Sequence, residues 1–488
     1  MKNTLRIAIL FILIVVVFLA AALFALSRLR LDAYRTGLEA ALTDALGVEV
    51  TISRLSLSWT TGPVVSVEGL FVSDPRLPGD YILFVPRVKT RLSLRSVLSD
   101  TLVVPHVLVE MPDVHLTEYR NGTSTWDLFV RGSSPEGIQA SGGVLTVVPS
   151  GAIRTTADAL MQRFRAADII IERVTIDDGS LFYRREENTG VVETVIFSRG
   201  IDIILTSEGS PPVRSLLESP DTLSLAEGSM SGSIDHVNIS GLEFVVKSFT
   251  NIVSDGLVTV KRVRIDAYEG TLDASGTMNI TDPSFPATLA LEVTDLAIHR
   301  LLNTFSDEKD LVVGTLEAYG SFEFTGRSLS SMLSTIVGRG EFAITDGYIT
   351  DFSIRKELAD GMYVPEFLLP EELDTGAFDY LGGPYRVGNE RIWFDDSRVT
   401  APTYTAAAHG YVAFDETMDF AGEIYPSEEV LNTTKLQRLA ELSGNENLFR
   451  IIPFTVVGSF DDVDFAVELN SPLFHRLLDV LKNIDIGI

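Results

Sequence analysis

The chain has 488 residues, of which 45% are hydrophobic and 22% charged, a composition typical of folded proteins rather than disordered ones. It carries 39 Lys and Arg against 67 Asp and Glu, a formal net charge of −28, which disfavours binding to nucleic acid or to anionic headgroups. It has no cysteine, which excludes disulfide frameworks, zinc ribbons and thiol catalysis.

The N-terminus carries a long apolar run, Ile7 to Leu26, without a charged or strongly polar side chain. At about 1.5 Å per residue, a helix of this run reaches roughly 30 Å, the thickness of a bilayer core. A cleaved signal peptide is the alternative, but the run exceeds the usual signal core of about 7–15 residues. We therefore expect a single-pass anchor, with the large domain outside the cytoplasm because long domains are translocated largely regardless of charge.

An amphipathic helix and then a series of strands are predicted after this run. Leu31, Tyr34, Leu38 and Leu42 recur at three- and four-residue steps, and Gly47 is a plausible helix stop. We expect this helix to close the membrane-side end of a sheet. Strands with alternating apolar residues follow up to an Asn121–Gly122 turn: Val48–Ile52, Leu55–Trp59, Val64–Val72, Arg87–Leu94, Leu102–Met111 and Val114–Tyr119.

Gly, Ser and Pro concentrate between Arg131 and Ala152, which predicts a linker or long loop over 131–165 with a helical piece over Thr156–Phe164. Strands then resume. Asp177–Asp178–Gly179 is interpreted as a turn between two of them. The predicted strands are Ile169–Ile176, Ser180–Arg184, Ile201–Thr206, Gly232–Ile239 and Leu242–Phe249.

The remaining residues are the most regular, and Thr271–Ile280 alternates without a fault between apolar and polar side chains. Such a strand builds a sheet with one apolar and one polar face. Helices are predicted at Ser328–Val337, Lys435–Leu442 and Leu473–Leu481. The predicted strands are Val263–Tyr268, Leu272–Ile280, Ala287–Val293, Leu316–Phe324, Glu341–Ile344, Gly347–Asp351, Arg391–Phe394, Tyr404–Phe414, Met418–Ile424, Phe454–Phe460 and Val463–Leu469.

No convergent catalytic or metal-binding set emerges from the sequence. The six histidines lack metal-ligand spacing, and there is neither a nucleophile elbow nor a phosphate-binding loop. Gly338–Phe342 is interpreted as a turn because it precedes a strand and not a helix. The pairs Asp177–Asp178, Asp395–Asp396 and Asp461–Asp462 are also interpreted as turn residues. We expect a protein without enzymatic activity, cofactor or metal.

Several segments resemble the AsmA-like family of bacterial envelope proteins. They include Tyr34–Leu57, Leu108–Phe129 with its Asn-Gly turn and Trp-Asp ending, Ile169–Arg184, and above all Ser328–Ile354 (SLSSMLSTIVGRGEFAITDGYITDFSI). The resemblance implies an elongated β-groove related to the TamB- and YhdP-like proteins. It further implies a protein of the cell inner membrane and periplasm that carries phospholipids toward the outer membrane. The family supplies no catalytic residue to carry over.

The predicted fold is mainly β: an N-terminal transmembrane helix, then an elongated antiparallel repeating β-groove with a few short amphipathic helices. We expect an anchor over 1–30, an N-terminal AsmA-like β region over 31–130, the linker over 131–165, a central β-groove region over 166–325 and a C-terminal AsmA-like module over 326–488.

The function expected is lipid transport that supports envelope integrity, with phospholipid acyl chains, the membrane and an envelope protein as partners. The expected groove residues are Leu272, Ala274, Met278, Ile280, Leu289, Leu291, Val293, Leu316, Phe322, Phe324, Val412 and Phe414. The first alternative is a scaffold or regulator of outer-membrane protein assembly with a closed core. The second is a polysaccharide-active enzyme built on strand-end carboxylates, which lacks a paired acid and base.

Overall fold

A computed structural model describes residues 35–58, 63–77, 79–91, 101–119, 125, 168–186, 192–207, 227–304, 310–326, 329–350, 353–362, 365–443, 445–459 and 462–467. The predicted anchor, the linker over 131–165, the Asn121–Gly122 turn and the helix over Leu473–Leu481 lie outside these residues. None of the helices in the described part combines the length and the hydropathy that a membrane span requires.

The described chain forms two compact units, both mainly β. Unit 1 holds the described residues up to Ser240 and Ser248–Gly256, and unit 2 holds Gly241–Lys247 and the described residues from Leu257 onward. β11 (Leu242–Ser254) has residues in each unit. The predicted domain boundaries are not tested by this division and stay predictions.

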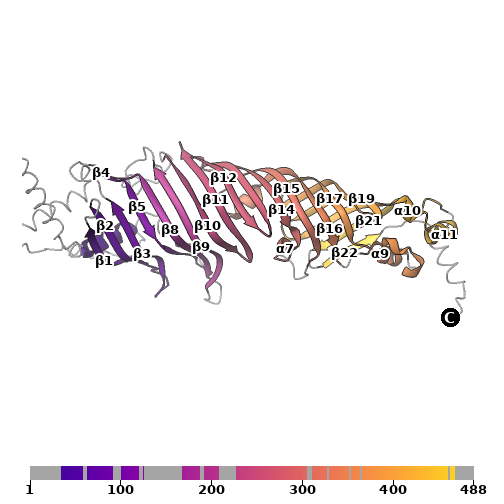
Figure 1. Cartoon of the computed structure of the whole chain (residues 1–488), viewed down its shortest axis with the longest axis horizontal. Helices are drawn as coiled ribbons and strands as arrows, with labels where there is room; N and C mark the ends of the chain where they lie inside the picture. Colours follow the sequence, from indigo (N-terminus) through magenta and orange to yellow (C-terminus); the bar gives the residue numbers. More distant parts are fainter. Residues whose placement is uncertain are drawn as a thin grey trace, which may run out of the picture. The chain divides into compact units, whose positions relative to one another are not determined.

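Unit 1 begins with a helix and continues as strands (Figure 1). Its elements are α2 (Arg35–Leu46), β1 (Val50–Ser58), β2 (Val64–Ser73), β3 (Tyr81–Arg91), β4 (Thr101–Val104), β5 (His106–Glu110), β6 (Asp113–Glu118), β7 (Asp168–Ile171), β8 (Arg173–Glu186), β9 (Val192–Ser207) and β10 (Gly228–Ile239).

Side chains of α2 bond to the backbone of β1 along the edge that β2 leaves free. The N–H of Ile52 donates to Glu39 Oε1 at 2.8 Å, and the N–H of Val50 donates to Thr43 Oγ1 at 3.0 Å. Arg35 Nη1 donates to the Ile52 carbonyl at 2.9 Å. Because unpaired edge groups invite further strands, these bonds close the β1 edge of the sheet; that this edge faces a membrane stays a prediction. Gly47 ends the helix with a positive φ of 69°, as predicted.

The prediction of a purely antiparallel sheet was wrong for unit 1. β1, β2 and β3 pair antiparallel, but β5 and β6 both pair in parallel with β8, and β4 pairs in parallel with β7. A parallel pair needs a long connection between its strands, and the chain between β6 and β8 supplies one. The predicted strand Leu102–Met111 is interrupted at Pro105, which has no N–H for a ladder.

Two acidic pairs predicted to be turns lie inside strands instead. Asp177–Asp178–Gly179 is a β-bulge in β8, where the register with β9 shifts and Asp178 has a φ of 53°. Asp395–Asp396 is the corresponding irregularity of β18 against β19. A bulge inserts an extra residue and bends its strand. Because Asp and Gly tolerate the backbone angles of turns and bulges alike, composition could not separate the two.

Unit 2 is a long antiparallel series of strands with helices near its C-terminal end (Figure 1). Its strands are β12 (Leu257–Ala267), β13 (Gly270–Asn279), β14 (Ala287–Ala297), β15 (Val312–Phe324), β16 (Val337–Ile349), β17 (Ala377–Gly388), β18 (Arg391–Thr400), β19 (Tyr404–Ala413), β20 (Thr417–Pro426), β21 (Ile452–Ser459) and β22 (Asp462–Val467). Its helices are α7 (Ile298–Leu302), α8 (Leu329–Thr335), α9 (Ile354–Met362), η3 (Glu366–Leu368), η4 (Glu371–Leu373), α10 (Glu428–Leu431) and α11 (Thr434–Ser443).

The sequence predictions for unit 2 were wrong for two features of β16, for β17 and for several short helices. β16 is one strand that passes through Asp346, whose φ is 51°, whereas two strands were predicted. Gly338–Phe342, predicted as a turn, lies in the first half of β16. β17 was missed because Gly382–Gly383–Pro384 reads as a turn, and the structure has a register shift there. The short helices α7, α9, η3, η4 and α10 were also missed.

One hydrophobic core is closed by the helices of unit 2. Ile354 and Leu358 of α9, Leu436 of α11 and Ile452 of β21 have between 0% and 2% of their surface exposed. They pack with Leu369, Leu373, Val430 and Phe449 in one cluster. The helices therefore cover part of the sheet, and the rest of the same face is considered below.

Candidate functional site

The strand register of unit 2 aligns apolar side chains into continuous rows. Residues directly opposite each other on paired strands point to the same face. Row A runs from β12 to β22 through Val260, Gly276, Leu289, Phe322, Gly338, Val387, Ile392, Val412, Met418, Gly458 and Val463. Row B, two residues along, runs through Val263, Ala274, Leu291, Gly320, Gly340, Tyr385, Phe394, Gly410, Phe420, Val456 and Phe465.

Rows A and B form what we call the open apolar face. The apolar side chains of the two rows are half-buried, apart from Val463 at the β22 end, which is exposed. A third row on the same side is different, since its members Ile344, Ala406, Ile424 and Ile452 are buried and belong to the closed core. Within the described residues, the helices thus cover one margin of the face and leave rows A and B partly accessible.

Glycines on the open apolar face leave room for aromatic rings from neighbouring strands. A Cβ on Gly338 would lie 2.3 Å from Phe322 Cδ1, and one on Gly340 would lie 2.6 Å from the Tyr385 ring. A side chain at either position would collide with a ring, which explains glycine in the first half of β16. Phe394 and Phe420, from β18 and β20, lie 5.7 Å apart between ring centroids. On this face, aromatic side chains therefore lie next to glycine positions that have no side chain.

The structure places five of the twelve predicted groove residues in rows A and B. Leu289, Phe322 and Val412 lie in row A, and Ala274 and Leu291 lie in row B. Leu272 lies opposite Val293, and Met278 shares a row with Phe324 through Ala287. Leu316 packs against the closed core. Ile280 follows the end of β13, and Phe414, 38% exposed, lies in the turn after β19, so neither belongs to a strand.

Several residues of the face were not predicted. Val387 and Tyr385 belong to β17, which the sequence predictions missed altogether. Ile392, Phe394, Met418 and Phe420 lie on strands that were predicted, and their alternation was the signal that could have placed them on the face.

Unit 1 carries an apolar row of its own. It runs through Leu55, Val67, Val88, Val109, Ile176, Ile203 and Gly232, across antiparallel and parallel pairs alike. All of these residues except the buried Leu55 are half-buried. The two-sided pattern is therefore a property of both units.

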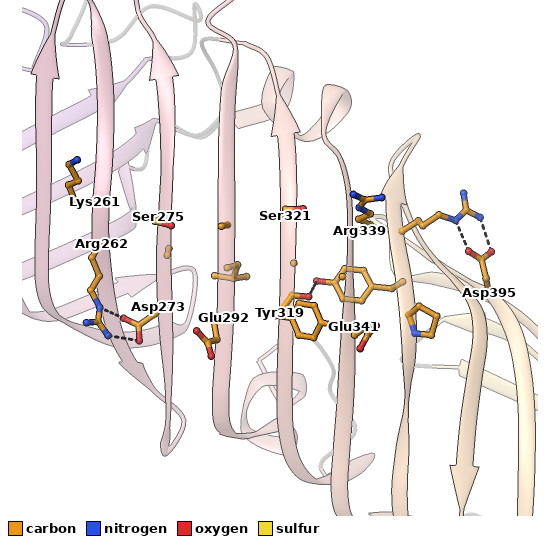
Figure 2. Close-up of a pocket in the computed structure, with 18 residues that line it drawn as sticks. Lys261, Arg262, Asp273, Ser275, Glu292, Tyr319, Ser321, Arg339, Glu341 and Asp395 are labelled. Atoms are coloured by element: carbon orange, nitrogen blue, oxygen red, sulfur yellow. Dashed lines mark hydrogen bonds and ion pairs between the residues drawn. The ribbon is translucent and has the colours of Figure 1, made fainter.

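The opposite side of unit 2 is polar and hollowed. A cavity of about 850 Å³ lies over β12 to β18, and Figure 2 shows its lining. Its lining includes small residues (Ser275, Ala290 and Ser321), long charged side chains, and five residues of row B: Ala274, Leu291, Gly320, Gly340 and Tyr385. The charged side chains point away from rows A and B, because adjacent strand residues point to opposite sides.

Arginine–aspartate pairs fix two ends of this polar cavity. Arg262 donates to both carboxylate oxygens of Asp273, at 2.7 and 3.0 Å, and Arg264 adds a bond of 2.7 Å. These bonds lower the pKa of Asp273 to about 2. Arg386 likewise donates twice to Asp395, at 2.5 and 2.7 Å, and lowers its pKa. Bidentate pairs of this kind are among the stronger surface interactions.

Histidine and acidic residues of the described part offer no metal centre. No group of three or more His, Asp or Glu side chains there is arranged to hold an ion. His115 is the most embedded candidate, at 13% exposure, with Nδ1 3.4 Å from Asp80 and Nε2 3.5 Å from Asp113. Its ring stacks on Tyr81 at 4.3 Å between centroids. It is a packed histidine of unit 1.

Comparison with known proteins agrees with the sequence resemblance. Residues 1–192 match the model of the AsmA family, a stretch that includes α2 and β1 through β8. A search among curated proteins finds no match. The family match therefore supports an AsmA-like protein over residues 1–192, and the mainly β units agree with it.

Proposed function

We propose that this protein is a non-catalytic lipid conduit, anchored in the inner membrane, whose open apolar face binds phospholipid acyl chains in the periplasm. The observation that carries the proposal is the pair of apolar rows that pass without a charged residue through every strand from β12 to β22. A sheet face of this kind needs either a covering layer or an apolar ligand.

The size of the face suits acyl chains. Strands spaced about 4.8 Å apart make each row roughly 50 Å long. One acyl chain occupies about half of a bilayer core of roughly 30 Å, so a row is longer than a single chain. Each buried CH₂ contributes about 0.8 kcal/mol, and this stabilisation hardly changes as a chain slides, because no charged group on the rows fixes its position.

The net charge supports recognition through the acyl chains rather than through an anionic headgroup. A chain at −28 repels anionic headgroups, whereas apolar contact does not depend on charge. On this proposal the headgroup stays in water, and the lipid supplies the outer membrane with the help of an envelope protein partner.

The test is lipid co-purification with a matched pair of variants. Leu291→Asp places a carboxylate in row B, and Thr288→Asp places the same group on the exposed, polar face of the same strand, outside the polar cavity. We expect native mass spectrometry to show bound phospholipid in the wild type and in Thr288→Asp, and a loss of most of it in Leu291→Asp.

Equal lipid occupancy in both variants would contradict the proposal. Absence of lipid from the wild type as well would favour the second candidate, a scaffold for envelope protein assembly, which the closed core under α9 and α11 would suit.

A further inference from the structure

The polar cavity of unit 2 is electrically balanced, although the chain as a whole is strongly acidic. Its lining includes four cations and four carboxylates: Lys261, Arg262, Arg339 and Arg386, and Asp273, Glu292, Glu341 and Asp395. The whole chain carries 39 basic against 67 acidic residues. The charge balance of the cavity lining thus differs from that of the whole chain, and the apolar face does not explain this difference.

The charges of the cavity are sorted into two rows by the strand register. One row aligns Ser275, Ala290, Ser321 and Arg339, with Lys261 in the adjoining bulge of β12. The other row, two residues along each strand, aligns Asp273, Glu292, Tyr319 and Glu341. Figure 2 shows the first set at one level of the strands and the second set at the next. Two residues of a strand span about 6.7 Å.

Not all of these charges are used within the protein. Arg262 and Arg386 are held by Asp273 and Asp395. In the described residues, the side chains of Lys261, Arg339 and Glu292 make no hydrogen bond or salt bridge. Glu341 accepts from the Tyr319 hydroxyl, a bond that raises the pKa of Tyr319. The cavity therefore offers two cations with two serine hydroxyls along one row, and two carboxylates with a phenol ring along the other.

We infer that this cavity binds a phosphoammonium zwitterion, a small ligand with a phosphate and an ammonium group. Arg339 and its direct cross-strand partner Ser321 supply charge and donors for the phosphate oxygens. Lys261 lies four strands away on β12 and adds only to the positive potential of this row. Glu292 and Glu341 face the ammonium group, and the ring of Tyr319, 54% exposed, offers it a cation–π contact. A ligand with only a phosphate would meet the carboxylate row and be repelled.

This site goes beyond the proposed lipid conduit, because charged side chains and not apolar ones would recognise its ligand. These charged side chains alternate along β13 to β16 with those of row B and point away from rows A and B, although five residues of row B also line the cavity. The phosphoammonium group has two sources, the headgroup of a membrane lipid and a free water-soluble compound.

The test is calorimetric titration of the full chain in detergent with glycerophosphoethanolamine, glycerophosphate and ethanolamine. We expect a dissociation constant on the order of 1 mM for the zwitterion and binding roughly tenfold weaker for either single-charge probe. Arg339→Gln is expected to weaken zwitterion binding about fivefold to tenfold. The double variant Glu292→Gln/Glu341→Gln is expected to abolish the preference over glycerophosphate.

A matched control and a competition arm complete the design. Arg300→Gln removes an exposed arginine that pairs with Glu269 outside the cavity, and it is expected to bind as the wild type does. Displacement of the probe by phosphatidylethanolamine in mixed micelles, but not by phosphatidylglycerol, identifies a lipid source. Displacement by neither identifies a free compound. Binding that does not favour the zwitterion, or that both cavity variants retain in full, would overturn the inference.

Discussion

Leu→Ala substitutions at two positions of unit 2 distinguish an open face from a closed core. Leu358 on α9 is 0% exposed and belongs to the closed core, whereas Leu289 in row A is half-buried. If rows A and B are open to solvent, the two substitutions have different energetic consequences, although the atoms removed are the same.

The expected magnitudes follow from burial. A leucine that loses three carbons forfeits about 2.4 kcal/mol of transfer free energy when fully buried, at about 0.8 kcal/mol per carbon. At Leu358 a cavity adds to this loss, so we expect the free energy of unfolding to fall by about 3–5 kcal/mol. At Leu289 roughly half of the transfer free energy applies and no enclosed cavity forms, which gives about 1 kcal/mol.

Urea denaturation of the full chain, followed by circular dichroism and with slopes compared between variants, measures both values. Addition of phospholipid should raise the free energy of unfolding of the wild type, because a ligand of the folded state stabilises it. It should raise that of Leu289→Ala by less. A loss of 2 kcal/mol or more at Leu289 without lipid would show that another layer covers row A.

Three further predictions concern single residues. Gly338→Val forces a side chain into the Phe322 ring and should lower the free energy of unfolding by about 1–3 kcal/mol, measured in a thermal melt. At Gly388 a Cβ would have no atom nearer than 3.8 Å, so Gly388→Ala should change the free energy of unfolding by less than about 0.5 kcal/mol. Equal effects of the two substitutions would refute the packing account. Glu39→Ala removes the acceptor of the Ile52 N–H and should cost about 1–2 kcal/mol, with Glu39→Gln recovering most of it; no recovery would refute a role as acceptor. The arginine partners of Asp273 lower its pKa from 3.8 to about 2. The stability that its carboxylate contributes is therefore complete above about pH 4 and is lost as the pH falls through about 2. If the difference in stability between the wild type and Asp273→Asn does not shrink over this range, the assignment is contradicted.

The sequence was a good guide where a strand alternates cleanly. The pattern of Thr271–Ile280 identified β13 and its apolar side, and the structure puts Leu289 and Leu291 of β14 on the same side of the sheet. The amphipathic helix before Val48 and its stop at Gly47 were also predicted, because period and glycine act locally.

The failures have a common physical cause, since they depend on contacts between distant segments. Gly338 and Gly340 look like turn residues until the rings of Phe322 and Tyr385 from neighbouring strands are placed over them. The covered margin of the face depends on where α9 and α11 pack, which no local pattern specifies. The cavity was missed because its two charged rows exist only through the register of several strands.

The most direct measurement is site-specific photo-cross-linking in cells, with a photoreactive amino acid at position 291 or at position 288 of the full chain. Both positions are on β14, but Leu291 lies in row B and Thr288 on the polar face, outside the polar cavity. Our account predicts phospholipid adducts, detected by mass spectrometry, at position 291 and few or none at position 288. Equal adducts at both positions, or none at position 291, would contradict a lipid-binding role of the open apolar face.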